Sequence, residues 1–525
     1  MTRYSSVCSG LVLSLSVVLV ASFRLTATAP RAKCQGVFVE PGSNIQSVID
    51  ASPQGATLCV QPGEFRIETP LNPKDNQRLV AAGPGAILNG SKLIEGFAPS
   101  GANFVAAGFL PKVPEHDANC IVPGCQIEQD VFFDGQPLKR ALRLRELASG
   151  KFYEDFPRNL IYLRDDPTGH KVEQAFATRI IQSTHSGITM QGFIVEKAAV
   201  PAQFGAIDAE YAHGNGWLIQ NNEVRYNHGA GITTYPSTAQ AGGSTIQLNF
   251  VHHNGQEGVE ACGPNMVVRK NEIAFNNTAG FDTGWEAGGS KFGCDSPKEI
   301  VNLTVEENYV HDNFGNAIWC DGNCYNVSIV GNRVTNNVLV DPSNGNQFGY
   351  GIFFEISSKC VISNNTLSAN GPTPTAPNRT TFYDSGAIVV ADSPYCEVYG
   401  NTVTGVDGIG MLQQRRTDDC TFQGGSAYPD GTPVCPGGFH QVHDTNIHDN
   451  TSTETAMPGR GWEIAGLDED IHDSKFFTSK NNRFVHNTYH LPSLAGAYFS
   501  WFDLLVDKDQ WIADGQDTRG TFLSP

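Results

Sequence analysis

A short pattern that ends in asparagine recurs along this chain and constrains its fold more than any other feature. An apolar residue, two variable residues and then asparagine close β-like runs such as WLIQNNEV and VSIVGNRV. Between 22 and 49 residues separate the recurring positions, which are Asn222, Asn249, Asn271, Asn308, Asn332, Asn365, Asn401, Asn450 and Asn482. A constant strand core with a variable period indicates one supersecondary unit per turn, with loops of different length inserted on one side.

Parallel stacking of these units explains why asparagine recurs. Strands this short cannot bury an inner face alone, but in parallel, about 4.8 Å apart, they form a continuous core. Equivalent asparagine side chains can then hydrogen-bond along a ladder. A second strand type with alternating apolar residues precedes many of them, as in GAGITTY, QEGVEAC, GNAIWCD, GYGIFFE and SGAIVVA. The sequence therefore predicts an all-β fold, a single-stranded right-handed parallel β-helix over roughly residues 55–490.

The two ends of such a solenoid must be covered, because open ends expose sheet edges. Residues 43–51 predict a short amphipathic helix with Ile45, Val48 and Ile49 on one face and Ser43 or Asn44 as its N-cap. This helix would close the N-terminal end. The aromatic residues of the last stretch are expected to pack over the other end, and they are Phe499, Trp501, Phe502 and Trp511.

Composition changes divide the chain into segments. We expect a signal peptide over residues 1–29, an N-terminal cap with the first turns over 30–97, an insertion or side module over 98–170, the main β-helix over 171–490 and a C-terminal cap over 491–525. The side module lacks the asparagine repeat and carries the cluster Arg140, Arg143 and Arg145. A solvated face and a site for an anionic group are the two interpretations of that cluster.

The N-terminus predicts export. Arg3 precedes an apolar run from Leu11 to Val20, and small residues follow at 27–29. An uncleaved membrane anchor is the alternative, although the run is short for a span. The net charge of 35 − 54 = −19 becomes 33 − 54 = −21 without this segment. That acidity argues against a nucleic-acid partner, and the absence of an internal run of about 18 apolar residues argues against integral membrane association.

Twelve cysteines remain after removal of the leader, an even number that suits disulfides in an exported protein. Spacing alone does not determine connectivity, and tetrahedral zinc is the alternative, although no paired CxxC supports it. Local spacing suggests Cys34–Cys59, Cys120–Cys125, Cys262–Cys294, Cys320–Cys324, Cys360–Cys396 and Cys420–Cys435.

The order of helix cap, strand LCVQPGEFRI and asparagine-punctuated turns resembles exported proteins of the pectate-lyase-like right-handed parallel β-helix superfamily. Stretches such as GWEAGGSKF, NYVHDNFGNAIWCDGNCYNVSIVGN and DQWIADGQDTRGTF resemble a bacterial-type subgroup of β-helix repeat proteins, over roughly residues 36–520. The superfamily includes lyases, hydrolases, epimerases, esterases and adhesins. The chain lacks the RxPxxR, NTD/GHG and DPHD motifs of its best-known enzymes, so no catalytic role carries over.

Candidate catalytic residues come from aligning the second strand type. AGGSK, AIWCD and GIFFE place Lys291, Asp321 and Glu355 in one column, with Trp319 and Phe353 two residues earlier on the same face. The preceding GVEAC places Glu260 in the Trp319 column and Cys262 in the Lys291 column. We expect an exposed strip, to which nearby loops would add Glu286, His311, Asp312, Arg415 and Arg416.

Three kinds of chemistry suit this strip, and one structural role competes with them. Asp321 and Glu355 could be the acid and nucleophile of a glycoside hydrolase, or ligands of Ca²⁺. Lys291 could be a base beside a uronate carboxylate if its pKa were lowered. Trp319 and Phe353 would stack on sugar rings, and ordinary packing is the alternative for Trp285 and Trp319. The structural alternatives are a salt-bridge ladder between strands, and for His311 and Asp312 a turn cap.

The leading hypothesis is an exported carbohydrate-active protein, secreted, periplasmic or at the cell surface, that cleaves a polysaccharide in a groove along the β-helix. Hydrolysis is favoured over β-elimination because carboxylates outnumber bases in the column. The alternative is a non-catalytic glycan-binding or structural protein. A groove blocked by loops, or acids paired to arginines, would favour that alternative. We expect a glycan partner, a monomer, and no cofactor other than Ca²⁺.

Overall fold

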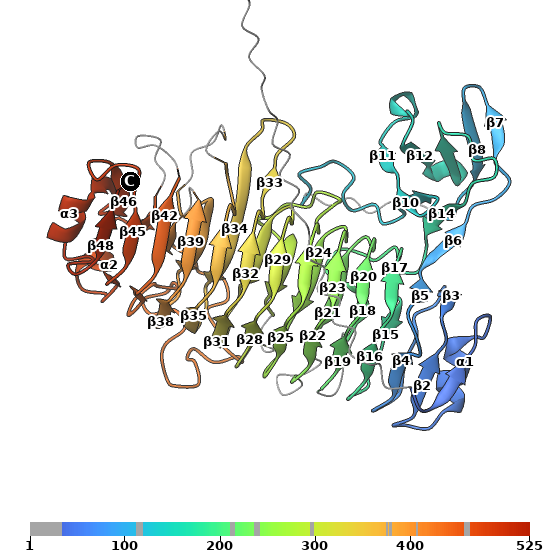
Figure 1. Cartoon of the computed structure of the whole chain (residues 1–525), viewed down its shortest axis with the longest axis horizontal. Coiled ribbons are helices and arrows are strands. Elements are labelled where there is room, and N and C mark those ends of the chain that lie inside the picture. Colours follow the sequence, from blue (N-terminus) through green and yellow to red (C-terminus); the bar gives the residue numbers. More distant parts are fainter. Residues whose placement is uncertain are drawn as a thin grey trace, which may run out of the picture.

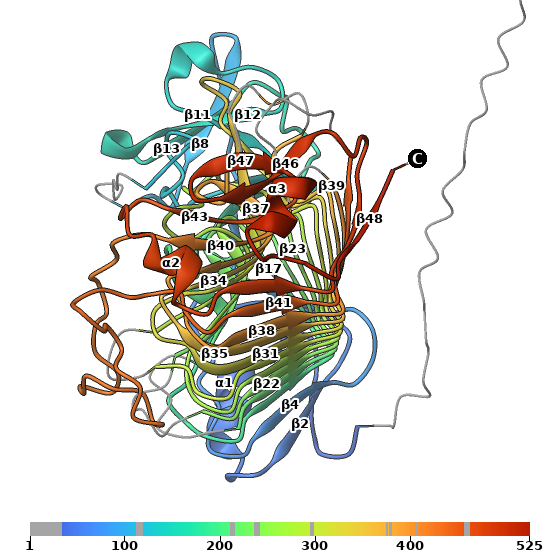
Figure 2. The ribbon, with the colours of Figure 1, turned by 90° about the vertical axis from the view of Figure 1, so that its left-hand side faces the viewer.

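The computed structural model describes residues 34–111, 119–209, 216–235, 242–294, 299–373, 376, 381–405, 408–455 and 463–524. The expected signal peptide over 1–29 therefore lies outside the described residues. Within these ranges, no helix is both long enough and apolar enough to cross a membrane. The chain winds into a solenoid in which each coil contributes one strand to each of three long sheets (Figures 1 and 2). This confirms the predicted parallel β-helix.

Sheet A carries the strands that precede the first asparagine turn, and all its pairs are parallel. In spatial order it contains β1 (Val37–Val39), β2 (Thr57–Val60), β4 (Arg78–Ala81), β16 (Thr189–Gln191), β19 (Leu218–Gln220), β22 (Thr245–Gln247), β25 (Val267–Arg269), β28 (Thr304–Glu306), β31 (Tyr325–Val330), β35 (Ser358–Ser363), β38 (Cys396–Tyr399), β41 (Asn446–His448) and β44 (Arg483–Val485).

Sheet B follows that turn in each coil. It contains β3 (Gly63–Arg66), β5 (Ala86–Asn89), β17 (Ile194–Glu196), β20 (Glu223–Arg225), β23 (Phe250–His252), β26 (Glu272–Ala274), β29 (Tyr309–His311), β32 (Arg333–Thr335), β36 (Thr366–Ser368), β39 (Thr402–Gly405), β42 (Thr451–Glu454), β45 (Thr488–His490) and β48 (Thr521–Leu523).

Sheet C holds the second strand type. It contains β15 (Ile181–Gln182), β18 (Gly205–Asp208), β21 (Ala230–Thr234), β24 (Glu257–Ala261), β27 (Gly288–Phe292), β30 (Asn316–Cys320), β34 (Gln347–Glu355), β37 (Ser385–Ala391), β40 (Ile409–Gln413), β43 (Ala465–Glu469), β46 (Ala497–Trp501) and β47 (Leu504–Asp507). Two strands join sheet C in antiparallel orientation. The short strand β33 (Leu339–Val340) pairs with β34, and β47 pairs with β46.

Residues 91–175 build two smaller sheets that project from one end of the solenoid (Figure 1). One contains β6 (Ser91–Leu93), β9 (Val131–Phe133), β10 (Gln136–Pro137) and β14 (Val172–Ala175). The other contains β7 (Ala98–Ser100), β8 (Asn103–Ala107), β11 (Lys139–Ala141), β12 (Lys151–Asp155) and β13 (Leu160–Leu163). Their own apolar cluster includes Val131, Phe152 and Ile161. We call these two sheets the side module.

Stacked apolar residues fill the interior of the solenoid. In sheet A the register places equivalent side chains one above another, in the order Ile219, Ile246, Val268, Val305, Ile329, Ile362, Val398 and Ile447. All of them are buried in one continuous core. Each coil thus buries its apolar face against the coils on either side, as the repeat predicted.

An asparagine ladder joins the coils at the turn between sheets A and B. Each side chain donates to the next one, as from Asn308 Nδ2 to Asn332 Oδ1 at 3.0 Å. The ladder ends differently from the prediction. Asn450 pairs with Asn487, not with Asn482, and Asn487 donates to Asp517. The run before Asn482 is helix α2 (Lys475–Thr478) rather than a strand, which explains the wrong assignment.

A second ladder, which was not predicted, lies at the turn between sheets B and C. Its members are Asn227, Asn254, Asn276, Asn313, Asn337 and Asn370. Each lies five residues after a member of the first ladder, and this spacing was the available signal.

The ends are built largely as expected. Helix α1 (Ile45–Ala51) uses Asn44 as its N-cap and packs Ile45 and Ile49 into the core beside β2 (Figure 1). At the other end, helix α3 (Lys508–Ala513) brings Trp511 against Phe499, with ring centroids 4.9 Å apart. Trp501 is also buried, and Phe502 packs against Phe477 with ring centroids 4.8 Å apart, although 39% of Phe502 remains exposed.

All six predicted disulfides are confirmed: Cys34–Cys59, Cys120–Cys125, Cys262–Cys294, Cys320–Cys324, Cys360–Cys396 and Cys420–Cys435. Their sulfurs are therefore not available as zinc ligands. Cys360–Cys396 joins residues that face each other in adjacent sheet A strands. These bridges span at most 36 residues, so each is local in sequence.

Candidate functional site

The register of sheet C corrects the predicted column of charged residues. Glu260 pairs with Lys291, Lys291 with Trp319, and Trp319 with Phe353. Lys291 therefore shares the column of Glu260 and Trp319, two positions from where the alignment placed it. The sequence alignment matched Ala287 to Ala317. In the structure Gly288 pairs with Asn316, so Gly289 is the residue equivalent to Ala317. Three consecutive small residues made that choice ambiguous.

Asp321 and Glu355 do occupy equivalent positions on neighbouring coils. Glu355 is the last residue of β34, and Asp321 directly follows β30, two residues beyond the Trp319–Phe353 pair. Adjacent rungs of a parallel sheet are about 4.8 Å apart. The two carboxylates therefore emerge side by side at the end of their strands, as predicted.

The expected exposed strip is buried. Glu260 is 1% exposed, Glu355 5% and Lys291 8%. The side chains of Asp321 and Arg416 retain more contact with solvent, at 19% and 31%. The sequence could not show this cover because it comes from loops of different length that lie outside the repeat.

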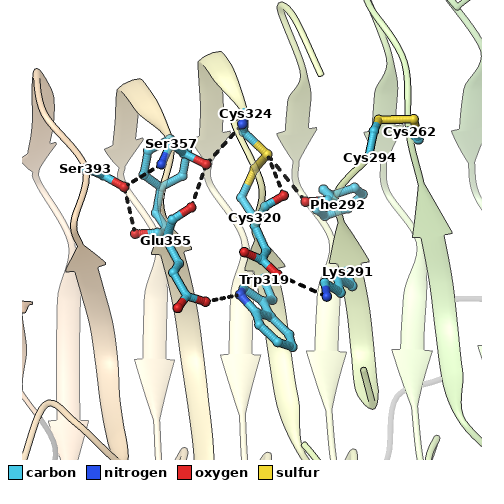
Figure 3. Close-up of a disulfide and its surroundings, with 12 residues drawn as sticks. Cys262, Lys291, Phe292, Cys294, Trp319, Cys320, Cys324, Glu355, Ser357 and Ser393 are labelled. Atoms are coloured by element: carbon cyan, nitrogen blue, oxygen red, sulfur yellow. Dashed lines mark hydrogen bonds and ion pairs between the residues drawn. A yellow bond between two sulfur atoms is a disulfide. The ribbon is translucent and has the colours of Figure 1, made fainter. Parts of the chain in front are cut away.

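Lys291 lies on the strand next to that of Trp319 (Figure 3) and is held between two carboxylates. Its Nζ lies 3.1 Å from Asp321 Oδ2 and 3.0 Å from Glu286 Oε1, and it donates to the carbonyl of Trp285. It also lies 4.2 Å from the centre of the Trp319 ring. Burial alone would lower the pKa of Lys291, but Asp321 and Glu286 raise it above its usual value. Lys291 is thus a fixed cation, and this does not suit the general base of a β-elimination.

Glu355 has a different environment from Asp321. Trp319 Nε1 donates to its Oε2 at 3.2 Å (Figure 3), and Arg416 contacts its other oxygen. Arg416 also pairs with Asp418 at 2.5 Å. Burial and the neighbouring Asp321 raise the pKa of Glu355 to about 7, against the opposing effect of Arg416. Glu355 can therefore hold or release a proton near neutral pH.

Two further residues of the cluster were missed, Tyr235 and Glu257. The Tyr235 hydroxyl donates to Glu260, and burial together with Glu286 raises the pKa of Glu260 and of Glu257 well above the usual value. One oxygen of each of these two glutamates is buried without a hydrogen-bond partner. Glu257 was visible in the sequence as a second carboxylate on the Glu260 strand.

Other predicted members lie elsewhere. His311 ends β29 in sheet B, where it contacts Glu272 and Asp312, so this pair belongs to another face of the solenoid. The guanidinium of Arg415 lies over the Phe439 ring instead of the acids.

The two aromatic residues expected to stack on sugars are packed within the protein. Phe353 stacks on Tyr350, with centroids 4.1 Å apart, and lies 5.8 Å from Trp319. Phe382, Val389 and Leu412 complete this buried cluster. The rings therefore form no open platform, and the Trp319 N–H instead orients Glu355.

The donor set at Asp321 and Glu355 does not fit Ca²⁺. A calcium site needs six to eight oxygen ligands. Here Lys291 already neutralises Asp321, and Arg416 neutralises Glu355. A divalent ion would have to displace both cations, so we derive no step through a metal.

Comparisons with known proteins agree with this architecture. The family model described as "Right handed beta helix region" matches residues 208–403. No curated protein matches the chain. Among solved structures, XylC in complex with xylose has a TM-score of 0.64 at 15% identity, covering 91% of this chain and 82% of that one.

Two further structures have lower scores. The A-module of the Azotobacter vinelandii mannuronan C-5 epimerase AlgE6 has a TM-score of 0.39 at 15% identity, covering 92% of this chain and 94% of that one. The catalytic unit of the GH87 α-1,3-glucanase from Streptomyces thermodiastaticus strain HF3-3 has a TM-score of 0.40 at 13% identity, covering 91% of this chain and 64% of that one. Such identities compare folds only. The matched region, the three parallel sheets and the asparagine ladders make this chain a right-handed parallel β-helix protein.

Proposed function

We propose that the protein is an exported glycoside hydrolase in which Glu355 is the general acid and Asp321 the second carboxylate. One observation carries the proposal: two carboxylates occupy equivalent positions on adjacent coils, and one of them can hold a proton near neutral pH. Burial and the neighbouring Asp321 raise the pKa of Glu355 to about 7 even though Arg416 contacts it, and Asp321 is bound to Lys291. A carboxyl group whose surroundings raise its pKa towards neutral pH is suited to act as a general acid.

In the proposed reaction, Glu355 gives its proton to the glycosidic oxygen as the bond to the leaving sugar breaks. Asp321 attacks the anomeric carbon and forms a glycosyl ester. Glu355, now ionised, removes a proton from water, which attacks the same carbon and releases Asp321. A retaining mechanism needs carboxylates about 5 Å apart, and Asp321 and Glu355 occupy equivalent positions on strands whose backbones lie about 4.8 Å apart. Lys291 keeps Asp321 oriented, and Trp319 orients Glu355.

Substrate would approach past Asp321 and Arg416, whose side chains are more exposed than those of Lys291 and Glu355. Because the described residues bury the rest of the strip, the open groove expected from the sequence does not expose these acids. We therefore propose that the site takes the end of a glycan chain or a short oligosaccharide. The six disulfides and the N-terminal leader pattern support export. XylC, a protein of the same fold, was solved with xylose bound, which agrees with a sugar substrate.

A second candidate is a non-catalytic binding or structural protein, and the ion pairs favour it. Asp321 is paired with Lys291 and Glu355 with Arg416, as in a salt-bridge ladder between coils. This was the arrangement expected of a structural role.

A substrate panel separates the candidates. The secreted mature protein would be incubated with neutral and acidic polysaccharides and short oligosaccharides, with and without Ca²⁺. Reducing ends and the ultraviolet absorbance of unsaturated uronates would be followed together. Reducing ends alone, lost in Asp321→Asn and Glu355→Gln, would support hydrolysis, and NMR of the first-formed anomer should show retention.

The other outcomes contradict the proposal. If both signals rose, the reaction would be β-elimination and attention would move to Lys291. No activity on any substrate, with both variants as stable as the parent protein, would favour the binding role.

A further inference from the structure

A cavity of about 500 Å³ lies between the side module and the β-helix. The side module contributes Phe132, Leu138 and Arg140, and the β-helix contributes Tyr226, His228 and His253. This volume is within the range of small-molecule sites, which occur preferentially where two structural units meet. None of the residues of the acid cluster lines it.

The cavity is preformed, because a charged contact fixes the module against the solenoid. Asp130 accepts from His228 at 2.9 Å and lies 3.4 Å from Arg140. The other ring nitrogen of His228 contacts the carbonyl of Cys125 at 2.7 Å. His228 and Arg140 hold the pKa of Asp130 below its usual value, although the partial burial of the carboxylate acts in the opposite direction. The carboxylate is therefore an ionised acceptor in the cavity wall, with about a third of its side chain exposed.

The charges of the lining argue against an anionic ligand. The guanidinium of Arg140 is already paired with Glu154 and Asp130. Burial and the neighbouring His252 lower the pKa of His253 to about 4, so its ring is neutral at physiological pH. Lys139 at the rim is an exposed cation. A phosphate or sulfate would meet the ionised Asp130, and because Arg140 is already paired, Lys139 at the rim would have to compensate for that charge.

The remaining features suit a neutral sugar. Tyr226 and Leu138 offer apolar surface for the C–H face of a ring. Asp130 accepts hydrogen bonds from hydroxyl groups, and Lys139 can donate to them. A wholly apolar ligand would leave these polar groups without water or partners, which is costly. An amphipathic ring with several hydroxyls satisfies both kinds of surface.

We propose that this cavity is a second carbohydrate site, which holds one neutral sugar unit of a glycan independently of Asp321 and Glu355. It would retain the glycan on the protein while another part of the same polymer, or another chain, occupies the acid cluster. Two linked contacts on one polymer raise the overall affinity through effective concentration.

The test measures binding in the full mature chain carrying Glu355→Gln, so that no probe is consumed. Cellohexaose, xylohexaose and laminarihexaose would be titrated by calorimetry and by ligand-observed NMR. Tyr226→Ala removes the ring, and Thr278→Trp fills the mouth of the cavity from an exposed position. Thr402→Trp, an exposed threonine on sheet B outside the lining, is the matched control.

We expect at least one probe to bind, with affinity reduced about tenfold or more by Tyr226→Ala and Thr278→Trp and unchanged by Thr402→Trp. If Tyr226→Ala does not fold, Thr278→Trp decides. Absence of binding by all three probes, or binding that survives Thr278→Trp, would overturn the proposal. Loss of hydrolysis in Asp321→Asn with this binding intact would show that the two sites are separate. Binding without any hydrolysis would refute the proposed activity alone.

Discussion

Glu355→Gln is the change that best separates catalysis from a structural ladder. In the parent protein, the pKa of Glu355 rises from 4.5 to about 7 on folding, which corresponds to roughly 3 kcal/mol. Because the folded state disfavours the ionised form, this stability is complete below pH 4.5 and is lost as pH rises towards 7. Glutamine keeps the shape and an oxygen for the Trp319 N–H but cannot ionise.

The variant should therefore lose that pH dependence. Urea unfolding at several values between pH 4 and 8 would compare the parent, Glu355→Gln and the control Glu95→Gln, which changes an exposed glutamate. We expect the parent to lose up to about 3 kcal/mol of unfolding free energy across this range and Glu355→Gln to lose correspondingly less. At pH 8 the variant should be at least as stable as the parent.

Activity supplies the second half of this prediction. Removing a general acid typically lowers kcat by about 10²- to 10⁴-fold. A variant that is inactive and stable at pH 8 would support catalysis by Glu355. A variant that is active but less stable, because Arg416 has lost one of its two carboxylate partners, would refute the reasoning and favour the ladder.

Three further predictions concern the frame of the protein. Asn308→Ala removes four hydrogen bonds inside the first ladder and should lower the free energy of unfolding by about 3 kcal/mol, and a loss below about 1 kcal/mol in urea titrations would contradict this. Reduction with a thiol should lower the melting temperature measured by circular dichroism, because six bridges restrict the unfolded chain, and an unchanged temperature would argue against it. EDTA should change neither hydrolysis nor melting temperature, since Lys291 and Arg416 already occupy the carboxylates; an EDTA-sensitive activity restored by Ca²⁺ would show that the charge argument is wrong.

The fold could be predicted from the sequence because its determinants are local. Each first-ladder asparagine closes its own strand, and each disulfide joins residues at most 36 apart. Even the errors at the ladder were local: Asn482 lies five residues before the true member, Asn487.

The site was less predictable because its geometry depends on other coils. Asp321 and Glu355 were aligned correctly, but three adjacent small residues left the position of Lys291 ambiguous by two. Glu286, a partner of Lys291, and Arg416, a partner of Glu355, come from loops, where the repeat gives no register. No periodicity indicates that Tyr235 covers Glu260, or that Phe382 covers Phe353. Burial, and with it the pKa of Glu355, therefore required the structure.

The ladders also determine how many residues can be inserted into or deleted from such a protein at one time. The coil from Asn249 to Asn271 is the shortest in the first ladder, and its removal would bring Asn222 directly beneath Asn271. Such a deletion leaves every remaining asparagine with a partner, whereas loss of a few residues within a strand would break both ladders at once. Gain or loss of whole coils is thus the tolerated change, and the number of coils between the side module and Asp321 sets the distance between the two proposed sugar sites.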